Sequence, residues 1–395
     1  MNILFISLYN PQETDSGNQR VTLVMAKELT RQGINCYLAY LKNTVEKTDA
    51  IFVDSYQMNY KKILEFRMFL QNNSIDVIHN QAYRIVDMSY LKNAKHSLPI
   101  KIVTVFHTMP GSELIRRSYS SLLLHVRYKQ DLFLKVVYFC AFLFSPILSL
   151  LVKRRLRQKY RDLCNNSDWI IFLSKSYIDS FKKLAELKSY SNCCFYSIPN
   201  SLSYELKLVN IEHKVKEFLI VARFDEISKR ILLALKIWKS FCDKFNQNGE
   251  WKLRIVGYGG WEKEYKTFVV KNKLHNVIFE GKQDPYLYYK KASFLLFTSA
   301  IEGFSLSLVE AMQMRCIPIA FKSYFAIQDV IENDYNGVLL EDNDINGYVN
   351  AMGDLIYNSN KCHTLSMNGM EYCKSISIDN VIGKWIDLYH NLLKD

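Results

Sequence analysis

The stretch SAIEGFSLSLVEAM, residues 299–312, joins the end of a strand to the start of a helix. The apolar run ASFLLF before it predicts a buried strand, and the helix is expected to begin near Ser305. A helix start offers unpaired N–H groups and a partial positive charge, which together bind anions. Glu302 precedes this start, and Glu310 lies further along the helix. The arrangement favours a ligand with a phosphate and hydroxyl groups, in which Glu302 binds a sugar and Glu310 holds a ribose diol.

Short apolar strands alternate with helical stretches along both halves of the chain. NILFISLY (2–9) opens the first series, and EFLIVARF (217–224) opens the second. This alternation predicts two α/β domains, each with a parallel sheet and right-handed crossovers. Ligands of such sheets bind at the carboxyl ends of the strands. Two sheets that face a central cleft are therefore expected to share one site.

The places where this alternation breaks predict the domain boundaries. The first Rossmann-like domain is expected over residues 1–200, with a basic and hydrophobic insert at 116–161. A polar connection follows at 201–216, and a second Rossmann-like domain is expected over 217–375. The last segment, 376–395, predicts an amphipathic helix that packs back toward the first domain.

The composition is typical of a folded protein. Of the 395 residues, 49% are hydrophobic and 23% are charged. The nine cysteines show neither a disulfide framework nor the spacing of zinc ligands, which predicts reduced thiols and a cytoplasmic location. The N-terminal MNILFISLYN lacks the basic leader of a signal peptide, and we expect it to form a strand.

The insert carries most of the net charge of +12. Between Arg116 and Arg161 there are eleven Lys or Arg residues and one acid, Asp131. Residues 136–152 contain no charge and are interrupted by Pro146. Apolar residues bracketed by Lys and Arg favour an anionic membrane surface as the partner, and nucleic acid is not expected. A buried helix pair with extended Lys and Arg side chains and a transmembrane span remain open as alternatives.

The segment EGFSLSLVEAM resembles the Glu-x7-Glu signature of glycosyltransferase family 4, which comprises retaining sugar transferases of the GT-B fold. VARFDEISKR resembles the segment in which that family has an Arg and then a Lys. The resemblance implies that Arg223 and Lys229 bind the donor diphosphate and that Glu302 is catalytic. It also implies diphosphate contacts at Ser305 and Leu306, donor-sugar contacts at Gly303 and Phe304, and ribose contacts at Glu310.

Four further segments resemble family elements in the same order. RIVGYGG resembles a glycine turn that allows close backbone approach at Gly257 and Gly259. TDSGNQR stands where the family has a loop that reaches the donor phosphates, which points to Gly17. VTVFHT resembles the strand end that carries a catalytic histidine, here His107. SIPNSL resembles the hinge element, with Ser201 in place of the usual glycine.

Each of these residues also has a structural interpretation. Glu302 is alternatively a first-turn acid favoured by the helix dipole, and Glu310 a solvated helix residue. Arg223 and Lys229 are alternatively surface charges. His107 at a strand end is alternatively a hydrogen-bonded structural residue.

The resemblance implies a retaining glycosyltransferase, of hexosyltransferase type, that uses a UDP- or GDP-linked sugar. The acceptor is expected to be a membrane-associated glycan or a lipid-linked acceptor in the synthesis of cell-surface polysaccharide, such as lipopolysaccharide or capsule. Nothing in the sequence resembles the Asp-x-Asp metal element of the other transferase fold, so we expect neither a metal nor a cofactor. The location implied is the inner face of the cell membrane, with peripheral association. A membrane-docked module that binds nucleotide sugar without transferring it, and a GT-B epimerase or phosphorylase, are the alternatives.

Overall fold

The computed structural model contains two compact units. The first consists of Met1–Gly111, Lys153–Ser203 and Ile376–Asp395, and the second of Ser112–Val152 and Tyr204–Ser375. The predicted domains differ from this division at the insert, because residues 112–152 cluster with the second unit. The structure describes residues 1–10, 17–42, 50–129, 131–187, 193–205 and 214–394, so the predicted connection lies partly outside them.

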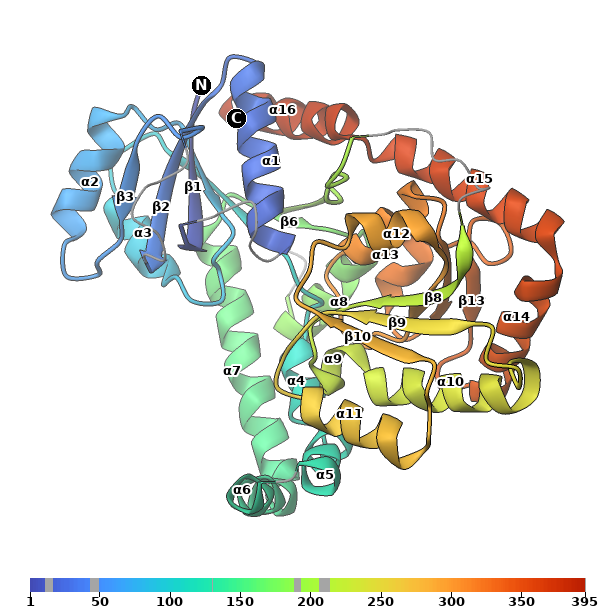
Figure 1. Ribbon diagram of the computed structural model, residues 1–395. Coiled ribbons are helices and arrows are strands. Elements are labelled where there is room, and N and C mark those ends of the chain that lie inside the picture. The colour runs from blue at the N-terminus through green and yellow to red at the C-terminus, as the bar shows by residue number, and fades with distance from the viewer. Residues whose placement is uncertain (11–16, 43–49, 130, 188–192, 206–213, 395) are drawn as a thin grey trace. The chain divides into compact units, whose positions relative to one another are not determined.

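The first unit is built on a seven-stranded sheet (Figure 1). Its strands are β1 (Asn2–Tyr9), β2 (Asn35–Lys42), β3 (Ser55–Gln57), β4 (Val77–Asn80), β5 (Lys101–Phe106), β6 (Trp169–Phe172) and β7 (Cys194–Ser197). They pair in parallel in the order β3-β2-β1-β4-β5-β6-β7. Ile3 of β1 aligns with Cys36 of β2 on one side and Val77 of β4 on the other. The central strands are apolar on both faces because helices cover both sides of a parallel sheet.

Helices from distant parts of the sequence pack on this sheet. They are α1 (Gly17–Arg31), α2 (Ile63–Asn72), α3 (Met88–Ala94), α8 (Ser176–Ala185) and α16 (Ile378–Lys394), together with most of α7 (Ser145–Asn166). Helix α16 buries one apolar stripe that includes Val381, Trp385 and Tyr389, and it lies against α1. The final helix therefore belongs to the first unit, although the whole second unit precedes it in the chain.

The second unit has a six-stranded parallel sheet. Its strands are β8 (Val215–Val221), β9 (Lys252–Val256), β10 (Val277–Gly281), β11 (Ala292–Phe297), β12 (Ile317–Phe321) and β13 (Val338–Leu340). Their order is β10-β9-β8-β11-β12-β13. This order reverses between β8 and β11, and a parallel sheet binds its ligands at such a switch point. The corresponding reversal in the first unit lies between β1 and β4.

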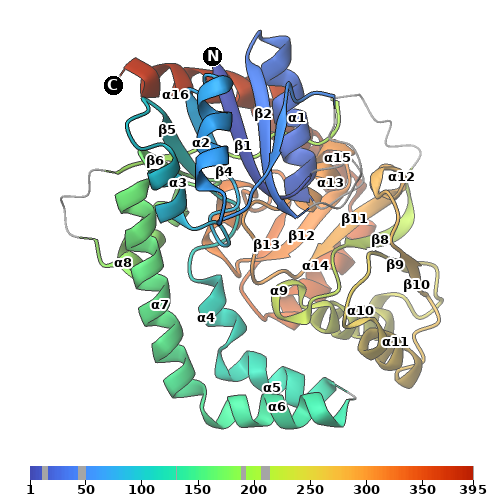
Figure 2. The ribbon, with the colours of Figure 1, turned by 90° about the vertical axis from the view of Figure 1, so that its left-hand side faces the viewer.

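Helices cover both faces of this second sheet. They are α9 (Glu226–Lys229), α10 (Ile231–Phe245), α11 (Glu262–Lys271), α12 (Tyr286–Lys291), α13 (Leu306–Gln313), α14 (Ile345–Tyr357) and α15 (Ser359–Ser375). Figure 1 shows α10 and α11 on one side of the sheet and α12 and α13 on the other. The insert adds α4 (Ser112–Arg116), α5 (Tyr119–Tyr128) and α6 (Leu132–Leu143), and Figure 2 shows α5 and α6 side by side.

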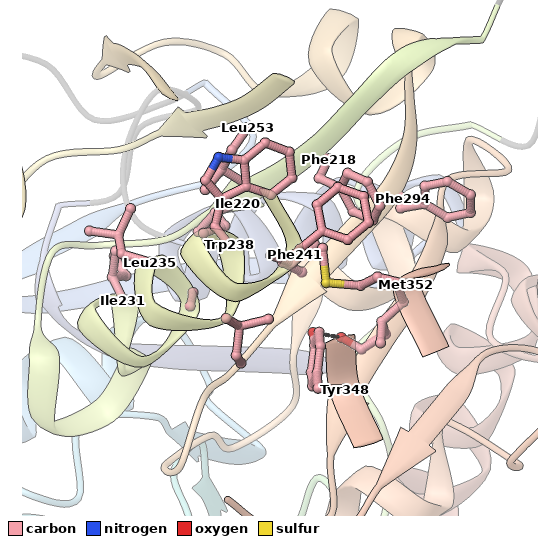
Figure 3. Close-up of a cluster of buried hydrophobic side chains, with 14 of the residues drawn as sticks. Phe218, Ile220, Ile231, Leu235, Trp238, Phe241, Leu253, Phe294, Tyr348 and Met352 are labelled. Atoms are coloured by element: carbon pink, nitrogen blue, oxygen red, sulfur yellow. Dashed lines mark hydrogen bonds between the residues drawn. The ribbon is translucent and has the colours of Figure 1, made fainter. Parts of the chain in front are cut away.

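The core of the second unit lies between its sheet, α10 and α14 (Figure 3). Trp238 of α10 packs its ring 5.5 Å from Phe218 of β8, and Phe218 stacks on Phe294 of β11 at 4.9 Å. The Trp238 indole N–H donates to Asn276 Oδ1 at 3.1 Å, so its polar atom is satisfied. This packing joins the middle of β8 to β11, and the candidate site lies at the carboxyl ends of the same two strands.

Candidate functional site

The candidate site lies where β8 and β11 end, at the switch point of the second sheet. The loop after β8 leads into α9, and the loop after β11 leads into α13. Backbone and side-chain hydrogen bonds tie these two loops together. The Ala300 N–H donates to the Ser228 carbonyl at 2.7 Å, and the Thr298 hydroxyl donates to the Lys229 carbonyl at 2.9 Å. A displacement of one loop is therefore transmitted to the other.

An ion pair joins the two loops at the start of α13. The Lys229 ammonium donates to a carboxylate oxygen of Glu302, and the two side chains are only 17% and 11% exposed. Lys229 is the last residue of α9, and its N–H donates to the Asp225 carbonyl at 2.8 Å. The structure thus brings together two residues that the sequence analysis assigned to a diphosphate and to a donor sugar. An ion pair this buried is costly to break, because removing one partner leaves an uncompensated charge.

Ser305 occupies the N-cap position of α13 and is buried. Its hydroxyl bonds the Tyr324 hydroxyl at 2.8 Å rather than the first turn of the helix. The Leu306 N–H, which was expected to bind the diphosphate, donates to the Phe304 carbonyl at 3.0 Å. Glu310 is fully enclosed on α13, which is incompatible with the alternative of a solvated helix glutamate. Gly303, the remaining residue of this turn, is buried.

Arg223 follows β8 and projects outward, with its side chain 68% exposed. Its Nη2 lies 3.6 Å from Asp225 Oδ2, and the same carboxylate accepts a hydrogen bond from Arg116 Nη2 at 2.8 Å. Arg116 also donates to the Ser228 hydroxyl at 2.5 Å. Burial by itself would raise the pKa of Asp225, but the hydrogen bond and charge of Arg116, together with the Ser228 hydroxyl and the charge of Arg223, outweigh burial and lower that pKa.

Arg116 is a residue of this site that the sequence did not predict. It was counted only among the basic residues of the insert, since 109 positions separate it from Asp225 and no motif spacing connects them.

Arg230 is a second residue that the sequence analysis missed. Its backbone is left-handed, with φ of 50°, at the junction between α9 and α10. The guanidinium donates to the Thr298 carbonyl and to the Ser323 hydroxyl, both at 2.6 Å, and pairs with Asp342 at 2.8 Å. The Arg230 side chain therefore joins the residue after α9 to the loops that follow β11, β12 and β13.

The glycine turn after β9 packs directly on the loop after β8. A Cβ at Gly257 would lie 1.8 Å from the Ala222 carbonyl oxygen, and a Cβ at Gly259 would lie 2.7 Å from the Phe224 carbonyl oxygen. Both glycines also adopt positive φ, 149° and 152°, which side chains rarely tolerate. The Phe224 N–H donates to the Tyr258 carbonyl at 2.8 Å. The close approach that these two glycines permit is therefore between the turn after β9 and the loop after β8 of the same chain.

His107 follows β5 in the first unit and is 8% exposed. Neither ring nitrogen has a hydrogen-bond partner within the part of the chain that the structure describes, so the alternative of a hydrogen-bonded structural histidine is not supported. Burial lowers the pKa of His107 to about 4, and the ring is therefore neutral at pH 7. An unpaired, buried imidazole is costly unless a ligand or water satisfies it.

A small cavity of about 10 Å³, room for one water molecule, adjoins His107. His79, Gln81, Asn200 and Trp385 also line it. His79 Nδ1 lies 2.6 Å from the Tyr389 hydroxyl, and its Nε2 lies 3.1 Å from Gln81 Nε2. The cavity therefore combines strand ends, the predicted hinge element and the C-terminal helix of the first unit. Gly17, the expected phosphate-loop residue, is the first residue of α1, and residues 11–16 before it lie outside the described ranges.

Helix α6 buries none of its side chains. Leu132 is 77% exposed and Phe133 is 75% exposed, and the apolar surface continues into the start of α7. No single helix among the described ranges is long and apolar enough to cross a membrane, although α6 and α7 meet the test as a pair bent by 77°. The exposed apolar residues of this surface are Leu132, Phe133, Leu134, Val136, Val137, Phe139, Leu143, Phe144, Ile147, Leu150 and Leu151.

Among the residues that the structure describes, no group of three or more His, Cys, Asp or Glu side chains is arranged to hold a metal ion. Metal independence stays a prediction.

The comparisons with known proteins concern both the fold and the segment that carries this site. Residues 206–372 match the family model described as glycosyl transferases group 1. The G117R mutant of S. aureus TarM, solved with fondaparinux, α-GlcNAc-glycerol and UDP, superposes with a TM-score of 0.72 at 13% identity, covering 98% of this chain and 99% of that chain.

The chain has the GT-B fold.

Two curated relatives share part of the sequence. An uncharacterized glycosyltransferase of Haemophilus influenzae is 26% identical over 193 residues, which are 47% of this chain and 52% of the relative. A Campylobacter jejuni α-1,4-N-acetyl-D-galactosaminyltransferase, named for an undecaprenol diphosphate-linked GalNAc acceptor, is 23% identical over 60% of this chain and 62% of its own length. The matched regions thus span between half and two thirds of these two relatives.

Proposed function

We propose that this GT-B protein is a retaining glycosyltransferase that uses a nucleotide diphosphate sugar and a membrane-associated glycan or lipid-linked acceptor. The observation that carries the proposal is the Lys229–Glu302 pair at the start of α13. In this pair, the cation that we propose binds phosphate lies beside the carboxylate that we propose binds sugar hydroxyls, at the switch point of a sheet that lies within the family match. UDP bound to TarM supports a nucleotide diphosphate as the ligand class.

The main chemical task is to stabilise the charge on the departing nucleotide diphosphate. Lys229, Arg223 and the partial positive charge at the start of α13 supply that stabilisation without a metal ion. Glu302 orients the donor sugar and stabilises the cation-like ring that forms as the sugar–phosphate bond lengthens. In front-face transfer, the acceptor hydroxyl attacks the side that the phosphate leaves, and the leaving phosphate takes the hydroxyl proton. The anomeric configuration is then retained.

The neutral charge and unpaired nitrogens of the His107 ring suit contact with a donor sugar. The ring is neutral at pH 7, and its two nitrogens are an unpaired donor and an unpaired acceptor among the described residues. A sugar hydroxyl satisfies either nitrogen without introducing charge. We propose that His107 contacts the donor sugar and that Gly17 lies near the donor phosphates.

An anionic membrane surface is the proposed partner of the exposed face of α6 and early α7. The face is apolar, and three exposed basic residues follow it closely on α7: Lys153, Arg154 and Arg155. Apolar side chains enter the acyl boundary while Lys and Arg contact lipid phosphates. The undecaprenol-linked acceptor named for the Campylobacter jejuni relative supports a lipid-linked acceptor, and we propose the inner face of the cell membrane as the location.

The test of this function is transfer of labelled sugar. The chain is incubated with labelled UDP- and GDP-sugars and a bacterial membrane lipid extract, and the lipid fraction is counted. The parent is expected to label lipid with at least one donor, and Glu302→Ala and Lys229→Ala are expected to lose that transfer. Lys239→Ala, which removes a half-exposed lysine of α10 that pairs with Asp243, is the matched control. Nucleotide-sugar binding without transfer in every pairing would favour the binding module, and an altered donor sugar without acceptor would favour the epimerase.

A further inference from the structure

The insert arm, residues 112–129, lies in the same compact unit as the candidate site. It comprises α4 and α5 and leads directly into the exposed helix α6. Two side chains of the arm, Arg116 and Lys129, contact the loops that follow β8 and β9. These loops are neighbours at the carboxyl end of the second sheet, and the first of them carries Lys229. The arm is therefore positioned to influence donor binding.

The first contact is made by Arg116 at the end of α4. Its Nη2 holds both Asp225 Oδ2 and the Ser228 hydroxyl, and Ser228 in turn accepts the Ala300 N–H through its carbonyl. Arg116 thus braces the point at which the two site loops are tied. It also neutralises Asp225, whose carboxylate lies 3.6 Å from Arg223. Without Arg116, Asp225 would hold Arg223 more strongly and withdraw that cation from a phosphate ligand.

The second contact is made by Lys129, which follows α5. Its ammonium donates to the Gly260 carbonyl at 2.6 Å and to Glu264 Oε1 at 3.0 Å, and it lies 4.4 Å from the Trp261 ring centre. Lys129 and Glu264 are both largely buried, so this pair is not a solvated surface contact. The His125 ring adds a contact to Trp261 at 5.2 Å. Together, Lys129 and His125 contact Gly260 and Trp261, the residues that end the glycine turn.

Aromatic contacts continue from the arm to α6. The His125 ring stacks on Tyr138 with centroids 4.0 Å apart and an interplanar angle of 8°. Tyr119 packs on Phe142 at 4.1 Å. The outward face of α6 is therefore separated from the glycine turn by two ring contacts, Tyr138 to His125 and His125 to Trp261. A change in how α6 packs on α5 reaches the site through these rings.

We propose that the insert arm couples lipid binding at α6 to nucleotide binding at the site, with Arg116 as the positioning residue. Binding of α6 to an anionic bilayer fixes how α6 packs on α5, and Arg116 and Lys129 then hold the two loops in the arrangement that binds the diphosphate. This inference rests on the proposed function, because it takes the site to bind a nucleotide diphosphate and α6 to bind a membrane. Linkage makes the coupling reciprocal, so a bound nucleotide strengthens lipid binding by the same factor.

The experiment measures nucleotide affinity by titration calorimetry on the full chain. UDP and GDP serve as probes, with no vesicles, with phosphatidylcholine vesicles, or with vesicles containing about 30% phosphatidylglycerol. We expect the anionic vesicles alone to lower the nucleotide Kd by about fivefold or more. The same nucleotide should lower the protein's apparent Kd for the anionic vesicles, measured by co-sedimentation, by the same factor. A nucleotide Kd that is equal in all three conditions overturns the coupling.

Variants test whether Arg116 carries the coupling between vesicle binding and nucleotide binding. Arg116→Gln is expected to bind anionic vesicles but to show one nucleotide Kd with and without them, and Arg116→Lys is expected to be intermediate. Arg117→Gln removes the exposed neighbouring charge and should keep the full vesicle effect. Phe133→Ser should weaken vesicle binding and leave the vesicle-free Kd unchanged, which separates coupling from misfolding. A full vesicle effect in Arg116→Gln refutes its role.

The outcomes also separate this inference from the proposed function. If neither UDP nor GDP binds under any condition, the proposed function fails and the inference fails with it. If a nucleotide binds with an affinity that vesicles do not change, the proposed function stands and only the coupling is wrong.

Discussion

Replacing Lys229 with methionine tests the structural and the ligand-binding roles of the ion pair at once. Methionine keeps most of the volume of the lysine side chain but removes the ammonium that pairs with Glu302, whose side chain is 11% exposed. Breaking a buried pair by removing one partner costs about 3–5 kcal/mol. Because the Lys229 side chain is itself 17% exposed, we expect a loss of about 3 kcal/mol in the unfolding free energy, the lower end of that range.

The double variant Lys229→Met/Glu302→Gln removes both charges and should recover most of that stability. It should not recover nucleotide binding, because the phosphate has lost a charged hydrogen-bond donor worth about 1.5–3 kcal/mol. That range corresponds to a rise of about tenfold or more in the UDP Kd. Urea unfolding followed by circular dichroism measures the stability of both variants, and calorimetry measures UDP binding. The reasoning is refuted if the single variant is as stable as the parent, or if the double variant binds UDP as tightly.

Three further predictions concern backbone strain and pH. Gly257→Ala should cost about 2–4 kcal/mol because its Cβ would meet the Ala222 carbonyl, whereas Gly260→Ala, with open space around it, should leave the unfolding free energy nearly unchanged in urea titrations. Burial raises the pKa of Glu226 to about 7, so the native state binds the carboxyl proton more tightly than the unfolded state does. The unfolding free energy should therefore fall by up to about 3 kcal/mol as the pH rises from about 4.5 to about 7. Glu226→Gln should remove that fall. Burial lowers the pKa of His107 to about 4, so the unfolding free energy should fall as the pH drops from about 6.5 to about 4. In thermal unfolding, His107→Phe should reduce this loss of stability. The same variant should also reduce sugar transfer.

The elements of both sheets were predictable because each depends on a local pattern. Apolar runs such as ASFLLF become buried strands wherever helices cover both faces of a sheet, and their spacing along the chain already indicated two α/β units. The order of strand, turn and helix around Glu302 likewise placed that carboxylate at a helix start before any tertiary information.

The partners of the site residues were decided only by tertiary structure. Arg116 reaches Asp225 across 109 positions, and His107 shares a cavity with Trp385 near the other end of the chain. Residues 112–152 pack with the second unit although they interrupt the sequence of the first.

The sequence by itself determined the alternation of strands and helices, the position of Glu302 before α13 and the basic, apolar character of the insert, since each is a property of neighbouring residues. The tertiary structure alone decided that Lys229 pairs with Glu302, that the two glycines make room for the chain itself, and that the insert braces the site. The physical reason is that periodicity reports only which face of a segment avoids water, whereas pairing between distant side chains depends on how the strand ends are brought together in the sheet.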